Sequence, residues 1–186
     1  QAIEDNHLEL CRYPRLLPHV AVRALYHASQ RALGGQARLL DQRRELGRVR
    51  RCHGDLRLAN ICLFEGRPTL FDGIEFSERI ACIDVLYDLA FVLMDLQLHG
   101  LAELGAALLQ SYLAYGGERE DCRPLPLFLS LRAATRCYTL ACSAMRQREP
   151  PAAQHKARQA LALLQQAKAY LHEDSELLTH FRQRQC

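Results

Sequence analysis

The sequence lacks the paired cysteines that disulfide-stabilised and zinc-binding domains use. It has eight cysteines, at positions 11, 52, 62, 82, 122, 137, 142 and 186, and no Cys-x-x-Cys pair among them. Most stand among apolar residues, where a thiol behaves as a small hydrophobic group. The pattern therefore indicates a reducing compartment and a cytoplasmic protein rather than a disulfide framework or a zinc site.

Long apolar runs and a one-sided charge are missing as well. No apolar stretch reaches the roughly 20 residues that cross a bilayer, and no basic segment followed by an apolar one indicates a secretion signal. The 24 Lys and Arg residues nearly balance the 21 Asp and Glu residues, for a formal net charge of +3. We therefore expect neither a membrane nor a nucleic acid as partner. The densest basic run, Arg43 to Arg51, is expected to be a solvated helix end rather than an anion site.

The sequence does contain enough apolar residues for a core. Of its 186 residues 49% are hydrophobic, which fits one domain or one lobe of a larger unit. Helical spacing predicts a helix over 17–33 that stops at Gly34-Gly35, and a second helix up to Gly47. Further helices are predicted over 83–100, 101–115, 125–146 and 152–171, with a frayed tail from His172. "NICLF" and "PTLF" predict a β-hairpin with a glycine turn.

The residues with chemical potential gather in "CHGDLRLANICLFEGRPTLFDGIEF", Cys52 to Phe76. Asp55 and Asn60 stand on one tight loop, and Asp72 follows the second strand of the hairpin, which would return it to Asn60. Phosphoryl transfer needs a carboxylate for the attacking hydroxyl, oxygen ligands for Mg²⁺ and a cation near the migrating phosphate. The segment therefore predicts a phosphate-transfer site.

Three elements of the sequence together resemble the aminoglycoside phosphotransferase-type family of kinase-like small-molecule kinases. They are His53-Gly54-Asp55-Leu56-x-x-x-Asn60, Phe71-Asp72 and Asp84-x-x-x-Asp88-Leu89-Ala90. The amino-acid sequence over 70–96 is similar to that of a bacterial subgroup of this family, whose members are often fused to a C-terminal P-loop ATPase domain. The resemblance implies a mainly α fold with a small β-hairpin, the C-terminal lobe of the protein-kinase-like fold. This lobe would occupy residues 1–171, with 172–186 as a tail or linker.

The resemblance also implies a role for each residue of the motif. Asp55 would be the catalytic base, and His53 a structural prop of its loop. Asn60 and Asp72 would hold Mg²⁺ and, through it, ATP. The alternatives are structural: His53 as a satisfied core histidine, and the other three as turn residues.

Four further residues are expected in or near this site. Asp88 would accept hydrogen bonds from backbone amides of the catalytic loop, since a carboxylate on an apolar helix face is costly unless paired. Asp84 would support the same region, or be a plain helix N-cap. Arg57, where many relatives have His, would neutralise charge on the phosphoryl oxygens or lie in solvent. Glu75, offset by one residue from an acid of choline-kinase-like relatives, is expected to contact the substrate or the residues around the metal.

The largest departure from the family is again an absence. The chain has no Gly-x-Gly-x-x-Gly and no Gly-x-x-x-x-Gly-Lys-[Ser/Thr] motif, and both of its lysines, Lys156 and Lys168, lie in the last predicted helices. We therefore expect the C-terminal lobe without its N-terminal, nucleotide-clamping lobe. The sequence begins with Gln, which favours a fragment of a longer protein over a degenerate stand-alone lobe. Alone, it is expected to bind ATP poorly and to expose an apolar upper face that needs a partner.

Three functions are compatible with these residues. The favoured one is ATP-dependent transfer of phosphate to the hydroxyl of a small molecule, with helices after Met94 forming the acceptor pocket. The second is a pseudokinase-like binding or regulatory module. The third, a metal-dependent hydrolase with His53, Asp55 and Asp72 as ligands, is disfavoured because no further histidine lies nearby.

The later helices bear on the acceptor. They carry the basic residues Arg132, Arg136, Arg146 and Arg148. A polycationic antibiotic would instead need acids in its pocket, so these residues favour a neutral or anionic acceptor.

Overall fold

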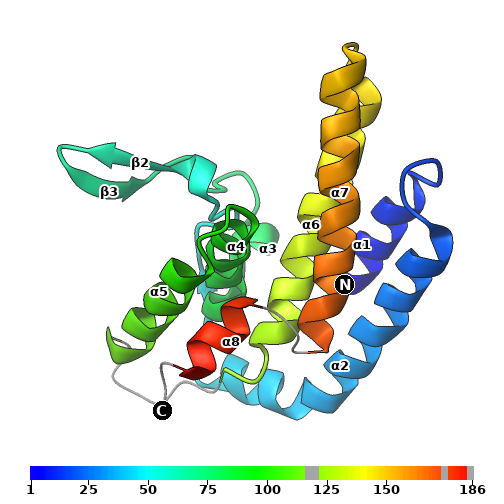
Figure 1. Ribbon diagram of the computed structural model, residues 1–186. Coiled ribbons are helices and arrows are strands. Elements are labelled where there is room, and N and C mark those ends of the chain that lie inside the picture. Colours follow the sequence, from blue (N-terminus) through cyan, green and yellow to red (C-terminus); the bar gives the residue numbers. More distant parts are fainter. Residues whose placement is uncertain (116–121, 173–175, 184–186) are drawn as a thin grey trace. The chain divides into compact units, whose positions relative to one another are not determined.

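The computed structural model describes residues 1–115, 122–172 and 176–183 (Figure 1). The chain divides into two compact units: residues 1–35 with 129–175, and residues 36–128 with 176–186. It is mainly helical with two small antiparallel sheets, which confirms the predicted class at that level. No helix in the described ranges combines the length and apolar character that a membrane span requires.

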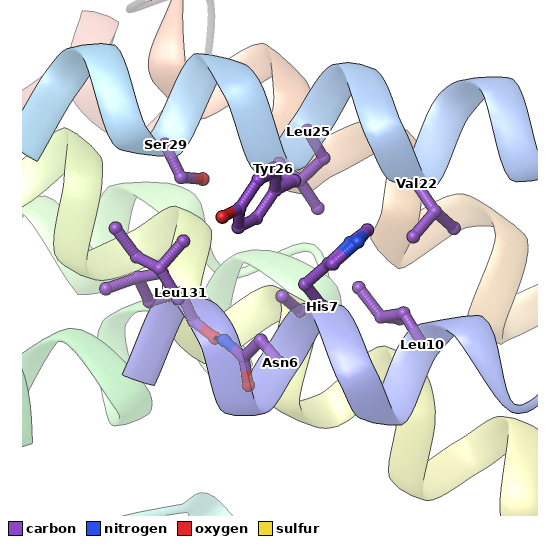
Figure 2. A pocket seen from close by; sticks show the side chains of 10 residues that line it. Asn6, His7, Leu10, Val22, Leu25, Tyr26, Ser29 and Leu131 are labelled. Carbon is purple, nitrogen blue, oxygen red and sulfur yellow. Dashed lines mark hydrogen bonds between the residues drawn. The ribbon is translucent and has the colours of Figure 1, made fainter. Parts of the chain in front are cut away.

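The first unit is built from helices alone. It contains α1 (Ala2–Cys11), the first part of α2 (His19–Glu45), most of α6 (Leu125–Arg146) and α7 (Pro150–Leu171). Helices α1, α2 and α6 enclose a small pocket with mostly apolar walls, where the rings of His7 and Tyr26 stack at 4.3 Å (Figure 2). Asn6 donates a hydrogen bond across it to the carbonyl of Leu131 at 2.9 Å. The pocket belongs to the packing of this unit.

Helix α2 corrects the prediction of two helices separated by Gly34-Gly35. The helix runs without interruption from His19 to Glu45. Both glycines are exposed, and a Cβ at either position would meet nothing within 4 Å. Two helical glycines cost about 1 kcal/mol each, but the flanking Ala, Leu, Gln and Arg residues are strong helix formers and carry the helix through.

Replacing Gly34 or Gly35 by Ala is expected to stabilise the protein by about 0.5–1 kcal/mol per site. The new methyl group is sterically unopposed, and alanine loses less backbone entropy than glycine on entering a helix. The melting temperature, followed by circular dichroism, should rise by roughly 1–4 °C for each replacement. A lower melting temperature in either variant would show that the helix breaks at this point in solution.

The second unit contains both sheets and the shorter helices. Its elements are the end of α2, β1 (Val49–Arg51), β2 (Ile61–Phe64), β3 (Arg67–Leu70), α3 (Glu78–Ala81), β4 (Cys82–Asp84), α4 (Val85–Leu98), α5 (Ala102–Tyr115) and α8 (Glu176–Gln183). Strand β1 pairs with β4 in antiparallel register, with Val49 opposite Asp84. Helix α5 packs against both α4 and α8.

The predicted β-hairpin is confirmed as β2 and β3, with Ile61 opposite Leu70. Glu65 and Gly66 form its turn, both with positive φ (50° and 75°), as tight antiparallel hairpins require. The hairpin projects away from the helices of its unit (Figure 1). Its apolar side chains are therefore left in solvent, Leu63 at 77% and Phe64 at 62% exposure.

Helix α4 forms the centre of the second unit. Helical spacing predicts one inner face, made of Ile83, Leu86, Leu89, Ala90, Leu93 and Met94. All of these but Ile83 are buried, and so are Phe91, Val92 and Leu96 on the other sides, so the helix is surrounded rather than amphipathic. Ile83, predicted on that face, lies instead in β4. The helix begins after Asp84, whose carboxylate accepts a hydrogen bond from the amide of Leu86 at 2.8 Å. Asp84 is thus an N-cap.

Three further expectations about local structure need correction. Pro150 and Pro151 open α7 rather than precede it, because the first helical turn needs no N–H donors. The tail is not frayed over 176–183, where α8 buries Leu177, Leu178 and Phe181. No disulfide forms among the cysteines in the described ranges, but only Cys137 is buried, and cysteines 11, 62 and 82 are exposed. The domain boundary at residue 171 stays a prediction.

Candidate active site

The loop from His53 to Asn60 has a shape that its sequence imposes. Gly54 adopts φ +83°, and a Cβ there would lie 3.0 Å from the Cδ1 atom of Ile74, so only glycine fits. The loop then closes on itself: the amide of Asn60 donates to the carbonyl of Arg57 at 2.9 Å, and its side-chain Nδ2 donates to the carbonyl of Asp55 at 2.8 Å. Asp55 and Asn60 therefore share one compact turn.

Asp55 is paired with Arg57 inside this turn. The guanidinium donates twice, from Nε to Oδ1 at 2.9 Å and from Nη2 to Oδ2 at 3.0 Å. These hydrogen bonds are the main reason why the pKa of Arg57 is raised. The nearby charges of Asp95 and Asp72 raise it as well. The guanidinium carbon lies 5.9 Å from the centre of the Phe91 ring. With only 22% of its side chain exposed, Arg57 does not extend into solvent.

The hairpin brings Asp72 back to the loop. The amide of Phe71 donates to the carbonyl of Asn60 at 3.1 Å, immediately before Asp72. His53 contacts both sides of Asp72: its Nε2 lies 2.8 Å from the Phe71 carbonyl, and its own carbonyl accepts from the amide of Ile74 at 2.8 Å. Asp72 is held between them at φ +60°, exposed to solvent.

The two nitrogens of the His53 ring have different surroundings. Its Nε2 must carry the hydrogen, because its partner is a carbonyl oxygen. Its Nδ1 is buried and has no hydrogen-bond partner in the part of the chain that the structure describes. This arrangement agrees with the predicted prop rather than a proton carrier, although the role itself stays a prediction.

Asp88 makes the contacts that were predicted for it. Its buried carboxylate accepts from the amide of His53 at 2.9 Å and from the amide of Gly54 at 3.1 Å. Two charge-assisted hydrogen bonds thus fix the start of the loop to α4.

Asp95 is a loop-anchoring residue that the sequence reading missed. Its side chain is 6% exposed, and its Oδ2 accepts from the amide of Leu58 at 2.9 Å. It follows Asp88 by seven residues, which places both carboxylates on one face of α4 two turns apart. An Asp within an apolar helical sequence could have predicted this contact, since burial is costly for any unpaired carboxylate on an apolar helix.

Arg43 is the exception to the expected solvated basic run, in which Arg44, Arg50 and Arg51 are exposed. Its guanidinium donates to both carboxylate oxygens of Asp84, each at 2.7 Å, and its side chain is only 4% exposed. Asp84 thus supports the region in two ways, as the N-cap of α4 and as the buried partner of Arg43.

Oxygen atoms beside the loop fit a magnesium ion. Both hydrogens of the Asn60 amide go to Asp55, to its carbonyl at 2.8 Å and to its Oδ2 at 3.0 Å. The Asn60 Oδ1 accepts no hydrogen bond from the described residues, and Asp72 follows Phe71, whose amide is bound to the Asn60 carbonyl. An amide oxygen and a carboxylate, with the other positions left to water or phosphate, suit Mg²⁺.

Other sequence-based expectations find less support. The described residues contain no group of three or more His, Cys, Asp or Glu side chains arranged to hold a metal. Glu75 is exposed, and its contact with the site stays a prediction. Arg132 is 6% exposed, so it is not a surface charge. It also belongs to the first unit, whereas Asp55 belongs to the second, and the preference for a neutral or anionic acceptor stays a prediction.

Comparison with known proteins agrees with this geometry. Two proteins of Mycobacterium tuberculosis and one of Mycobacterium bovis, each named only as an uncharacterised protein, are 29% identical over 132 residues. The match covers 71% of this chain and 26% of each relative, so the chain spans about a quarter of their length. No solved structure matches. The model described as "Phosphotransferase enzyme family" matches residues 8–125, which include the whole loop, the hairpin and α4. The predicted resemblance is thereby confirmed at the level of the family: the chain belongs to the phosphotransferase enzyme family.

Proposed function

We propose that this chain carries the catalytic loop of an ATP-dependent phosphotransferase that acts on the hydroxyl group of a small molecule. One observation carries the proposal: Asp55, Arg57 and Asn60 are hydrogen-bonded within one turn, beside Asp72 at the end of β3. This set supplies a base, a cation and oxygen ligands at one place, as phosphoryl transfer requires. Family membership supports the same chemistry without naming the acceptor.

The residues divide the work as follows. Asp55 takes the proton of the acceptor hydroxyl. The hydroxyl oxygen bonds to the γ-phosphorus while the bond from that phosphorus to the β–γ bridging oxygen breaks, and ADP is released. Arg57, already oriented against Asp55, donates to the phosphoryl oxygens on which charge accumulates. Asn60 and Asp72 would hold Mg²⁺, which neutralises phosphate charge when bound. His53 and Asp88 keep the loop and Asp72 in place.

The complete enzyme needs a second lobe over the hairpin. Leu63, Phe64, Leu70 and Phe71 are each about half exposed or more, and apolar groups clustered in this way favour a covering partner. The matched relatives are about four times as long as the matched segment. We therefore propose an N-terminal lobe that closes the nucleotide site on this hairpin, and a C-terminal P-loop ATPase domain as a further candidate neighbour. The thiols in the described ranges, none in a disulfide, fit a cytoplasmic location.

The test is Mg²⁺-dependent transfer of phosphate from γ-labelled ATP by the whole gene product. Sugars, amino alcohols and aminoglycosides serve as acceptors, with EDTA as the metal-free arm. Transfer to one class of acceptor should disappear in EDTA and return with excess Mg²⁺. In Asp72→Asn the Mg²⁺ concentration for half-maximal rate should rise by about 10-fold or more. The matched control is Asp41→Asn, which makes the same chemical change at a carboxylate 68% exposed on α2.

A different result would favour the alternative, a pseudokinase-like binding module. The observation behind it is that this chain carries no glycine-rich phosphate loop. If the whole gene product neither transfers phosphate nor binds nucleotide in the presence of Mg²⁺, the kinase proposal is wrong.

A further inference from the structure

Three side chains of α4 face the catalytic loop along one stripe of the helix. Asp88, Phe91 and Asp95 are spaced by three and four residues, so they lie one above another. Asp88 holds the amides of His53 and Gly54. Phe91 lies under the guanidinium of Arg57. Asp95, one turn further, holds the amide of the next residue, Leu58. Arg57 is thus enclosed by its own loop on one side and by this stripe on the other.

The burial of Asp95 calls for more than one amide hydrogen bond. A neutral side chain such as Asn would accept from the amide of Leu58 equally well and would not bring a charge into the apolar core. Among the described residues the ion pair that Asp95 makes is with His99, at 4.0 Å, and His99 is 57% exposed. Asp95 binds the amide of the residue that follows Arg57, and its charge is close enough to raise the pKa of the Arg57 guanidinium. A buried negative charge here attracts the guanidinium toward Phe91 whether or not Asp55 is engaged.

We infer that Asp95 is a positioning residue for Arg57, which keeps the guanidinium in the site when Asp55 turns to the acceptor hydroxyl. In the ligand-free protein Arg57 is paired with Asp55, and during transfer Asp55 must contact a hydroxyl instead. When Asp55 turns to the hydroxyl, the guanidinium loses its only hydrogen-bonded acid among the described residues. Without the second carboxylate, Asp95, it would then swing into water. The inference deepens the proposed function and rests on it, since it assigns a support to a residue of the same transfer site.

A double-mutant cycle on the whole protein tests this inference. Asp95→Asn keeps an acceptor for the amide of Leu58 and removes the charge, so kcat should fall about 10-fold with the KM for the acceptor unchanged. In an Arg57→Gln background the same replacement should have little further effect, because the group that it positions is gone. Asp41→Asn, which removes a carboxylate 68% exposed on α2, should leave kcat unchanged. If Asp95→Asn has no effect, or the same effect in both backgrounds, Asp95 does not act through Arg57.

A measurement without turnover separates this inference from the proposed function. The Nε–H signal of Arg57 is followed by NMR in the wild type and in Asp95→Asn, and the loop is checked through hydrogen exchange of the Leu58 amide. We expect the Arg57 Nε–H to exchange several-fold faster in the variant while the Leu58 amide stays protected. An unchanged Arg57 signal would overturn the inference. A wild type that transfers no phosphate but shows the faster Arg57 exchange in the variant would instead reject the proposed function and retain the positioning.

Discussion

Asp55→Asn is expected to lower the rate of phosphate transfer by about 10³-fold, because the amide cannot accept the proton of the attacking hydroxyl. The replacement has nearly the same shape, and its oxygen can still accept a hydrogen bond from Arg57. The loop should keep its conformation, since its amides are held from α4 by Asp88 and Asp95. Asn60 keeps its hydrogen bond to the backbone carbonyl of residue 55 and Asp72 is unchanged, so the affinity for Mg–ADP should stay at the wild-type level. The turnover rate at saturating ATP and acceptor, together with calorimetric binding of Mg–ADP, checks both statements.

The control separates loss of the base from loss of charge. Asp41→Asn makes the same chemical change at an exposed position of the second unit and should retain full activity. A rate for Asp55→Asn within about tenfold of the wild type would exclude Asp55 as the base, given the 10²–10⁴-fold contribution of such groups. Weak binding of Mg–ADP by the variant would show instead that Asp55 belongs to the nucleotide site.

The sequence predicted the tight loop from Asp55 to Asn60 and the hairpin that follows it, because their geometry is local. Gly54 demands a positive φ, Asn60 closes the turn five residues after Asp55, and the Glu65-Gly66 turn fixes the strand pairing. The hydrogen bonds of Asp88 could also be predicted, since a carboxylate on an apolar helix needs partners. These features depend on residues close in the chain or on one strong physical penalty.

The features that were missed depend on partners far along the chain. Strands β1 and β4 are three residues each and carry no apolar alternation, so only their pairing defines them. Arg43 looked like any other member of a basic run until Asp84, 41 residues later, supplied its partner. Helix α2 continues through two glycines because propensity is a weak preference that neighbours override. By contrast, the buried set of α8, with Leu177 and Phe181 four residues apart, was a readable helical pattern.

Arg43→Met is expected to destabilise the protein by about 3–5 kcal/mol, because it leaves the carboxylate of Asp84 buried without its partner. The lost contact is two-pronged, with both distances at 2.7 Å and side-chain exposures of 4% and 10%. Asp84 also caps α4, so an uncompensated charge there acts on the helix that holds the catalytic loop. Urea unfolding followed by circular dichroism measures the change in the free energy of unfolding.

Arg44→Met is the matched control, because it is the same replacement at the next residue. Arg44 is 69% exposed and forms only a 3.5 Å ion pair with the exposed Asp41, so its loss should change stability by less than about 0.5 kcal/mol. Adding Asp84→Asn to Arg43→Met should recover part of the loss, since the orphaned charge is then removed while the amide oxygen can still cap α4. Equal stability of the two Arg→Met variants would contradict the assignment of Arg43 as a buried partner. A double variant less stable than Arg43→Met would show that the N-cap needs the full charge of Asp84. It would also show that the position of α4, and therefore of the loop bound to it, depends mainly on this residue.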